Sequence, residues 1–235
     1  PDEIALNMMG VGFNVISLAT NHTMDKGITG ALNNAKFFKS KDVVKAGNYV
    51  SQEDRNNIPI YSENGITYAF LNYTYGTNGI PVPNGYSYAV NVWPMENWTA
   101  YSNYKAQVKK DIEQVRDKVD VVMVAMHWGT EYQVGYTNSY QQDAAKYLAS
   151  LGVDVIIGTH PHVVQPITFI DDTLVYIGKT QSGFKKRFQQ HKTKIYIWIK
   201  RIRHQQYFYE NTFTLNKLKM SIKSSKKTIP IINAL

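Results

Sequence analysis

Three apolar stretches of this chain each run directly into a short polar turn that carries histidine. The stretches are residues 11–19 before His22, residues 119–126 before His127, and residues 153–157 before GTHPH at 158–162, which holds His160 and His162. An apolar run that breaks at such a turn is typical of a buried strand ending at the surface. In parallel α/β sheets, ligands bind where the carboxyl ends of the strands run out. The pattern therefore predicts one functional site that collects four of the six histidines.

The segments between these stretches have the patterns of helices and hairpins. Helical spacing predicts helices at residues 28–40, 102–118 and 138–151, with Gly152 as a C-cap and residues 2–9 as the end of another helix. Extended patterns predict a short strand at 43–50, a loop at 53–58, and hairpins joining 58–61 to 66–73 and 167–170 to 174–177. Alternating helices and apolar strands predict an α/β fold whose mainly parallel sheet is covered on both faces.

The charge of the chain divides it into two regions. Residues 1–178 contain 12 Lys and Arg against 17 Asp and Glu, whereas residues 179–235 contain 14 basic residues and only Glu210. Such asymmetry predicts regions of different character. We expect a folded domain at 1–178 followed by a basic tail at 179–235 that is poorly ordered and prone to aggregate. The abrupt change also predicts that the tail is a continuation in a shifted reading frame.

Composition limits the chemistry and the location of the protein. The chain has no cysteine, so disulfides and thiolate metal sites are excluded, and any metal must be bound by His, Asn or carboxylates. The chain contains no run of about 18 apolar residues, so its sequence predicts no membrane-spanning helix. The first residues show no charged and apolar leader, so we expect no intact signal peptide or anchor in this chain.

The residues at the strand exits are suited to a metal site. Imidazole binds zinc, iron and manganese, and four histidines at three strand exits favour a shared centre over isolated surface histidines. Asn21 can add an amide oxygen. Asp25 has two interpretations, as the partner that orients His22 or as the N-cap of the next helix. Glu131 is a metal ligand, a substrate contact or an exposed loop carboxylate, and Trp128 is expected to pack in the core.

Three motifs in this order resemble those of the CapA family of poly-γ-glutamate capsule biosynthesis proteins, which are related to calcineurin-like metallophosphatases. The motifs lie at residues 17–27, 127–132 and 156–162, and the run at 72–79 resembles a loop of Gram-positive members. The resemblance covers about residues 2–177. It implies a four-layer α/β/β/α metallophosphatase-like sandwich, here incomplete, with a two-metal centre for divalent Mn, Zn or Fe ions. Two such ions together polarise a phosphoryl oxygen and activate water.

The resemblance also implies roles for individual residues. Asn21, His127 and His160 would bind one metal and His162 the other. His22 would be the general acid or a transition-state contact, and Asp25 would share its catalytic role. Candidates for substrate binding are Glu131, Tyr75 and Asn78.

The sequence departs from the family pattern at both ends. Family members begin with a strand that ends in Gly-Asp and supplies a metal carboxylate, and no such motif precedes Asp2 here. After residue 177 the chain also lacks the family's Gly-Asn-Phe type segment. We therefore expect this chain to be an inactive fragment that holds at most one metal weakly.

Three functions remain open at this point. The first is a bacterial CapA-like protein of capsule synthesis and export, acting on an anionic polymer or a phosphate ester with capsule-synthesis membrane proteins as partners. Its full-length relatives would be extracytoplasmic, at the cell surface and membrane-anchored. The second is a metal-dependent phosphoesterase or nucleotidase. The third is a non-catalytic protein that binds polyanions through the basic tail, and its affinity for them would fall steeply as the salt concentration rises. No specific nucleic acid is expected as a partner, since the sequence has no signature of a nucleic-acid-binding fold.

Overall fold

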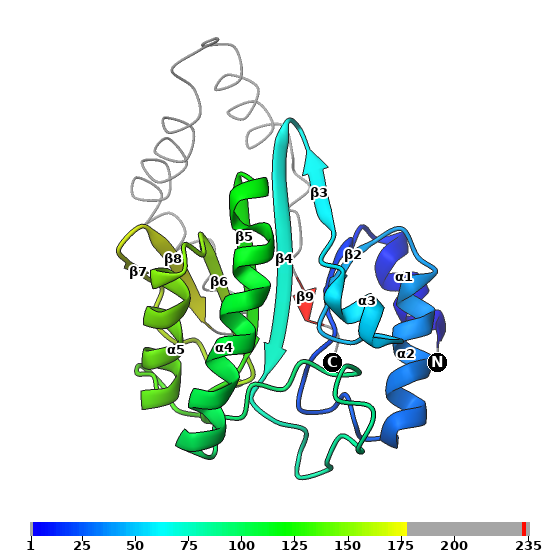
Figure 1. Ribbon diagram of the computed structural model, residues 1–235, viewed down its shortest axis with the longest axis horizontal. Helices are drawn as coiled ribbons and strands as arrows, with labels where there is room; N and C mark the ends of the chain where they lie inside the picture. Colours follow the sequence, from blue (N-terminus) through cyan, green and yellow to red (C-terminus); the bar gives the residue numbers. More distant parts are fainter. Residues whose placement is uncertain (1, 178–231, 234–235) are drawn as a thin grey trace.

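A large mixed sheet forms the centre of the fold (Figure 1). The computed structural model describes residues 2–177 and 232–233. The strands of the large sheet, in spatial order, are β3 (Ile60–Glu63), β4 (Ile66–Thr74), β5 (Val121–His127), β6 (Val155–Thr159), β8 (Thr173–Ile177) and β7 (Thr168–Ile170). The four inner strands run parallel, and β3 and β7 pair antiparallel at the edges. The parallel strands therefore end at one edge of the sheet.

A smaller parallel sheet packs against the large one. Its order is β2 (Val44–Ala46), β1 (Val15–Ser17) and β9 (Ile232–Asn233). Val44 and Ala46 of β2 share a buried apolar cluster with Phe70 of β4 and Ala125 of β5. Because β4 and β5 belong to the large sheet, this cluster is the interface between the two sheets.

Helices cover the outer faces of both sheets, which gives the order α/β/β/α (Figure 1). Helices α4 (Trp98–Val115) and α5 (Ser139–Ser150) pack on the large sheet through the main core, which includes the buried side chains of Ile112 and Leu148. Helices α1 (Asp2–Gly10) and α2 (Gly27–Lys39) cover the small sheet, where Phe38 packs on Ile16. The α/β fold with a mainly parallel central sheet is confirmed.

Several element boundaries differ from the predicted ones for local reasons. The strand predicted at 11–19 is observed only as β1. The N–H groups of Val11 and Phe13 donate hydrogen bonds to carbonyls of α1, so the start of the predicted strand continues the helical turn. Helix α3 (Gln52–Asn56) replaces a predicted loop, since the Ser51 side chain caps it by accepting from the Asp54 N–H. Helix α4 begins earlier than expected, because Asn97 caps its first turn.

The strand predicted at 43–50 is reduced to β2, and the other predicted elements are close to those observed. Both hairpins are present, and Asn64 and Gly65 adopt the positive φ angles that their tight turn requires. Gly152 follows α5 with a φ of 80°, as a C-terminal glycine does. Trp128 is fully buried in the main core, as expected. The expectations for the tail at 179–235 lie outside the described residues, except at Ile232–Asn233, which form β9. Among the described helices, none is long and apolar enough to span a membrane.

Candidate metal centre

The predicted site residues meet where the parallel strands end. In the register of the large sheet, His127 at the end of β5 lies opposite Thr74 of β4 and Thr159 of β6. The residues that follow those strands, Tyr75 and His160, therefore emerge beside His127. The ring centroids of His127 and His160 are 4.8 Å apart, and those of Tyr75 and His160 are 4.7 Å apart.

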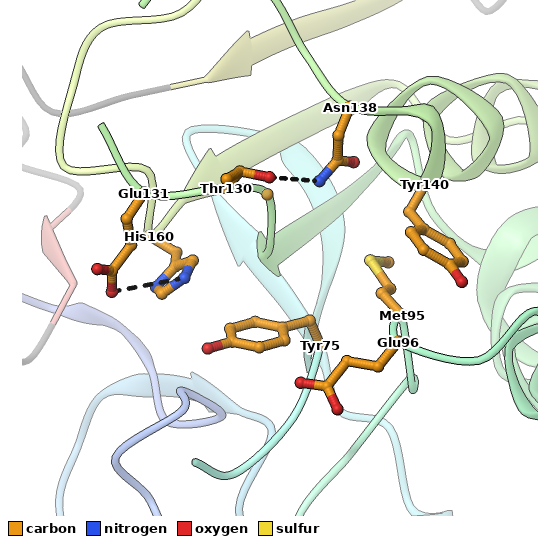
Figure 2. Close-up of a pocket in the computed structure, with 9 residues that line it drawn as sticks. Tyr75, Met95, Glu96, Thr130, Glu131, Asn138, Tyr140 and His160 are labelled. Carbon is orange, nitrogen blue, oxygen red and sulfur yellow. Dashed lines mark hydrogen bonds and ion pairs between the residues drawn. The ribbon is translucent and has the colours of Figure 1, made fainter. Parts of the chain in front are cut away.

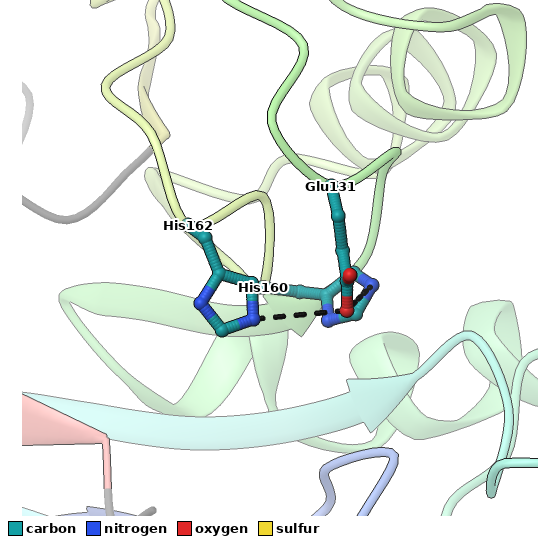
Figure 3. A group of neighbouring side chains, drawn as sticks. All are labelled: Glu131, His160 and His162. Atoms are coloured by element: carbon teal, nitrogen blue, oxygen red, sulfur yellow. Dashed lines mark ion pairs between the residues drawn. The ribbon is translucent and has the colours of Figure 1, made fainter.

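Glu131, His160 and His162 form a group that could hold a metal ion (Figure 3). One ligand atom from each residue lies within 4.8 Å of the other two. The Oε1 atom of Glu131 is 3.8 Å from Nε2 of His160 and 3.7 Å from Nε2 of His162. These separations are too long for hydrogen bonds. They are near the spacing of two atoms that share a metal with bonds of about 2.1 Å. The donor set of two imidazoles and a carboxylate fits zinc, manganese or iron.

The backbone at both histidines adopts an uncommon conformation. The φ angles of His160 and His162 are 90° and 59°. Side chains with a Cβ rarely occupy this region, and such residues cluster at functional sites, where the surrounding structure holds them. In this conformation two side chains of one short segment both face Glu131 (Figure 3).

A second pair of potential ligands lies beside this group. The Oδ1 atom of Asn21 is 2.8 Å from Nε2 of His127, and Nδ1 of His127 is 3.0 Å from Oγ1 of Thr159. Burial, followed by the nearby imidazoles of His160, His22 and His162, lowers the pKa of His127 to about 3. His127 is therefore neutral at pH 7, as a metal-binding imidazole must be.

The pKa of His160 is also lowered, and burial is again the largest cause. Glu131 acts in the opposite direction, because a nearby carboxylate favours the protonated ring, while His162 and His22 lower the value further. The imidazole of His160 thus keeps a lone pair available for a metal.

His22 lies at the exposed rim of the site and is held by a carboxylate. Its Nδ1 atom is 2.7 Å from Oδ2 of Asp25, and the side chain is 59% exposed. Helix α2 begins after Lys26 without a side-chain cap, so Asp25 contacts His22 and does not cap the helix. The contact favours the interpretation of Asp25 as the residue that orients His22.

Asn78 contacts the predicted site residues themselves. Its Oδ1 atom accepts a hydrogen bond of 2.9 Å from Nδ2 of Asn21, and its Nδ2 lies 3.3 Å from Nδ1 of His22. The long loop after β4 therefore folds back on the segment that follows β1. The geometry supports a positioning role for Asn78, which was predicted to bind substrate.

A cavity of about 410 Å³ opens next to the candidate metal group (Figure 2). Its lining includes His160, Glu131, Thr130, Asn138, Tyr140, Met95, Glu96 and Tyr75. Tyr75 lies between His160 on one side and Glu96 on the other (Figure 2). Burial is the main cause that raises the pKa of Tyr75, so its hydroxyl stays protonated at pH 7 and can donate a hydrogen bond. The cavity can admit a substrate group beside the candidate metal ligands.

A buried amide network holds the loop that carries Glu131. The Gln165 side chain has no exposed surface and donates to the backbone carbonyls of Gln133 and Tyr136, at 3.1 and 2.9 Å. It accepts a bond of 2.9 Å from Nε2 of Gln141, whose own Oε1 accepts from the N–H of Asn138 at the start of α5. The network joins the segment after His162 to the Glu131 loop. Sequence reasoning missed it, since a lone glutamine carries no local signal.

Gln165→Leu is expected to loosen the Glu131 loop. The change leaves two part-buried carbonyls and the buried Nε2 donor of Gln141 unpaired, and the buried donor alone costs about 1–3 kcal/mol. Hydrogen exchange should accelerate in residues 130–137 and stay unchanged in β4. Gly129→Ala offers an independent route to the same effect, because an added Cβ would lie 2.7 Å from Nε2 of Gln141. Unaltered exchange in both variants would show that the network does not hold the loop.

The structure brings the predicted site residues together, but it groups them differently from the assignment that the resemblance implied. His160 and His162 converge on Glu131, whereas the resemblance implied that they bind different metals. Asn21 contacts His127 as that assignment implies. Which of these side chains bind a metal stays a prediction.

The fold and the site define an α/β protein whose candidate metal ligands lie at the carboxyl edge of a parallel sheet. The model of the bacterial capsule synthesis protein family PGA_cap matches residues 1–178. The chain therefore belongs to this family.

Two curated relatives are similar over most of this chain. The PGA biosynthesis protein CapA of Bacillus subtilis (strain 168) is 28% identical over 175 residues, which are 71% of this chain and 41% of the relative. The capsule biosynthesis protein CapA of Bacillus anthracis is 29% identical over 180 residues, 74% of this chain and 41% of the relative. The chain thus matches less than half the length of these relatives.

One solved structure has a weaker likeness. A hypothetical protein from Thermus thermophilus aligns with a TM-score of 0.44 and 17% identity, over 71% of this chain and 53% of that chain. A likeness at this level carries no conclusion about function.

Proposed function

We propose that this chain provides the metal site of a capsule biosynthesis protein, and that it holds one divalent ion at Glu131, His160 and His162. The observation that carries the proposal is the convergence of these three side chains at the carboxyl edge of the sheet. Asn21 and His127 contact each other beside this group and supply the next available donors.

The arrangement suits hydrolysis or transfer at a phosphoryl or acyl centre. A divalent metal bound there would act as a Lewis acid toward a substrate oxygen. His22 lies at the exposed rim, where Asp25 fixes its ring and it can give a proton to a leaving group. Tyr75 can donate a hydrogen bond to a group in the adjacent cavity.

For the substrate and setting, we propose an anionic capsule polymer or one of its phosphorylated precursors, handled at the cell surface with membrane proteins of capsule synthesis. The support is family membership, together with the names of the Bacillus relatives, which place them in capsule or PGA biosynthesis. A general phosphoesterase or nucleotidase is the second candidate, and the His22–Asp25 pair beside a metal group favours it. The polyanion-binding alternative depends on residues 179–235, most of which lie outside the described part of the chain.

Metal analysis and two activity assays on the purified chain test the proposal. We expect one equivalent of Mn²⁺, Zn²⁺ or Fe²⁺ to bind. The chain loaded with each ion is then given poly-γ-glutamate, monitored by polymer length, and a chromogenic phosphate monoester. A change in polymer length supports the capsule function, and ester hydrolysis without it favours the phosphoesterase. Absence of metal binding would overturn the proposal.

His22→Ala should separate catalysis from metal binding. Loss of a general acid costs on the order of 10²–10⁴-fold in turnover, so any hydrolysis that the metal-loaded chain shows should fall by that factor. Metal stoichiometry should stay unchanged because His22 is not in the metal group. Glu113→Gln on the exposed face of α4 is the control and should leave both unchanged. Loss of metal in His22→Ala would show that the ring is a ligand.

A further inference from the structure

A single buried amide connects the two strands that present Asn21 and His127. Asn72 lies in β4 of the large sheet and is 1% exposed. Its Oδ1 atom accepts a hydrogen bond of 2.6 Å from the N–H of Ala19, just beyond the end of β1 in the small sheet. Its Nδ2 donates to the carbonyls of Ala125 at 3.2 Å, Ala19 at 3.4 Å and Tyr73 at 3.5 Å.

The two residues that Asn72 mainly contacts, Ala19 and Ala125, lie at equivalent positions relative to the candidate metal ligands. Ala19 precedes Asn21 by two residues, and Ala125 precedes His127 by two residues. No backbone ladder joins β1 to β5, because the strands belong to different sheets. The backbone of Asn91 links the sheets indirectly, since it bonds to the Gly47 carbonyl and to the Thr74 N–H. The Asn72 side chain adds a direct link, because it bonds to Ala19 on one side and to Ala125 on the other.

Gly47 packs closely against the hydrogen bond between Asn72 and Ala19. Gly47 follows β2 with a φ of 100°, a conformation that favours glycine. A Cβ added at Gly47 would collide with Oδ1 of Asn72 and lie 2.7 Å from both N and Cβ of Ala19. Gly47 therefore has to be a glycine for the backbone to pass this close to the hydrogen bond between Asn72 and Ala19.

We propose that Asn72 is a positioning residue of the metal site, which sets the distance between Asn21 Oδ1 and His127 Nε2 so that these two donors can complete the coordination of the ion. This inference rests on the proposed metal-binding function. A buried asparagine that only supports the fold would affect stability alone. A positioning residue also changes the geometry and affinity of the site it holds, as supporting hydrogen bonds around metal ligands do.

The test compares Asn72→Ala with Thr173→Val by Co²⁺ titration, urea unfolding and NMR. Thr173 is also buried and donates one hydrogen bond, to the Val153 carbonyl, but it lies at the start of β8, away from the carboxyl edge. We expect Asn72→Ala to weaken Co²⁺ binding by about 10–100-fold and to alter the visible spectrum of bound Co²⁺. Thr173→Val should lose stability with unchanged affinity and spectrum.

NMR of the histidine ring nitrogens in the metal-free chain gives a second readout. Asn72→Ala should remove the Asn21–His127 hydrogen bond, and Thr173→Val should keep it. An intact bond, with affinity no lower than in Thr173→Val, would overturn the inference. If the unaltered chain bound no Co²⁺, the proposed function would fail, and the ring signals would still decide the role of Asn72.

Discussion

Replacing His160 by alanine is expected to abolish the binding of a divalent metal to this protein. The His160 side chain is 4% exposed and its Nε2 faces the shared carboxylate of Glu131. Removing a direct ligand should cost more than the roughly 10–100-fold that is lost when a residue supporting a ligand is changed. Isothermal titration with Zn²⁺ and Mn²⁺ measures the loss.

Two further variants make this prediction specific. Glu131→Gln keeps the size of the side chain and removes its charge, and Glu131 is 45% exposed, so folding should be unaffected. Its affinity should also fall steeply, because a neutral amide oxygen attracts a dication less than a carboxylate does. The second variant, Glu113→Gln, removes an exposed carboxylate on α4 and should bind metal as the unaltered chain does. Unchanged affinity in both His160→Ala and Glu131→Gln would contradict the assignment of this group as the metal site.

The strand exits could be predicted because their signal is local. Each apolar run is long enough to indicate a buried strand, and each ends at a polar residue. The rule that parallel strands end at one edge then places His127 and His160 together on the strength of the sequence alone. The register of β5 with β6 confirms this placement.

The supporting residues could not be predicted, because their partners are distant in sequence. Asn72 and Gln165 are isolated amides whose meaning depends on backbone groups up to 53 and 32 residues away. The pairing of Glu131 with both His160 and His162 depends on positive φ angles, which no spacing rule indicates. Tertiary packing decides such features, and single-sequence patterns do not record it.

The buried ion pair between Arg55 and Asp111 is another such feature, and its loss should have the largest effect on stability. Arg55 of α3 binds both carboxylate oxygens of Asp111 of α4, at 2.6 Å each. The same carboxylate accepts bonds of 2.8 Å from the hydroxyl of Tyr73 and the amide of Gln107. The residues are only 6% and 3% exposed, so this group ties α3, α4 and β4 together away from water.

Asp111→Ala should lower the free energy of unfolding by about 3–5 kcal/mol, because it leaves the Arg55 guanidinium buried without a counter-charge. Urea denaturation followed by circular dichroism measures the change. The exposed pair Lys109–Glu113 on the same helix is the matched control, and Glu113→Ala should cost less than about 1 kcal/mol.

The double variant Arg55→Met with Asp111→Leu tests the cause. If the penalty of the single variant comes from an unpaired buried charge, replacing both partners by apolar side chains of similar volume should restore most of the stability. If the double variant is as unstable as Asp111→Ala, the stabilisation comes instead from the hydrogen bonds that Tyr73 and Gln107 make to the carboxylate. Because the pair packs on the helix side of the large sheet, metal affinity at Glu131, His160 and His162 should be equal in all of these variants that remain folded.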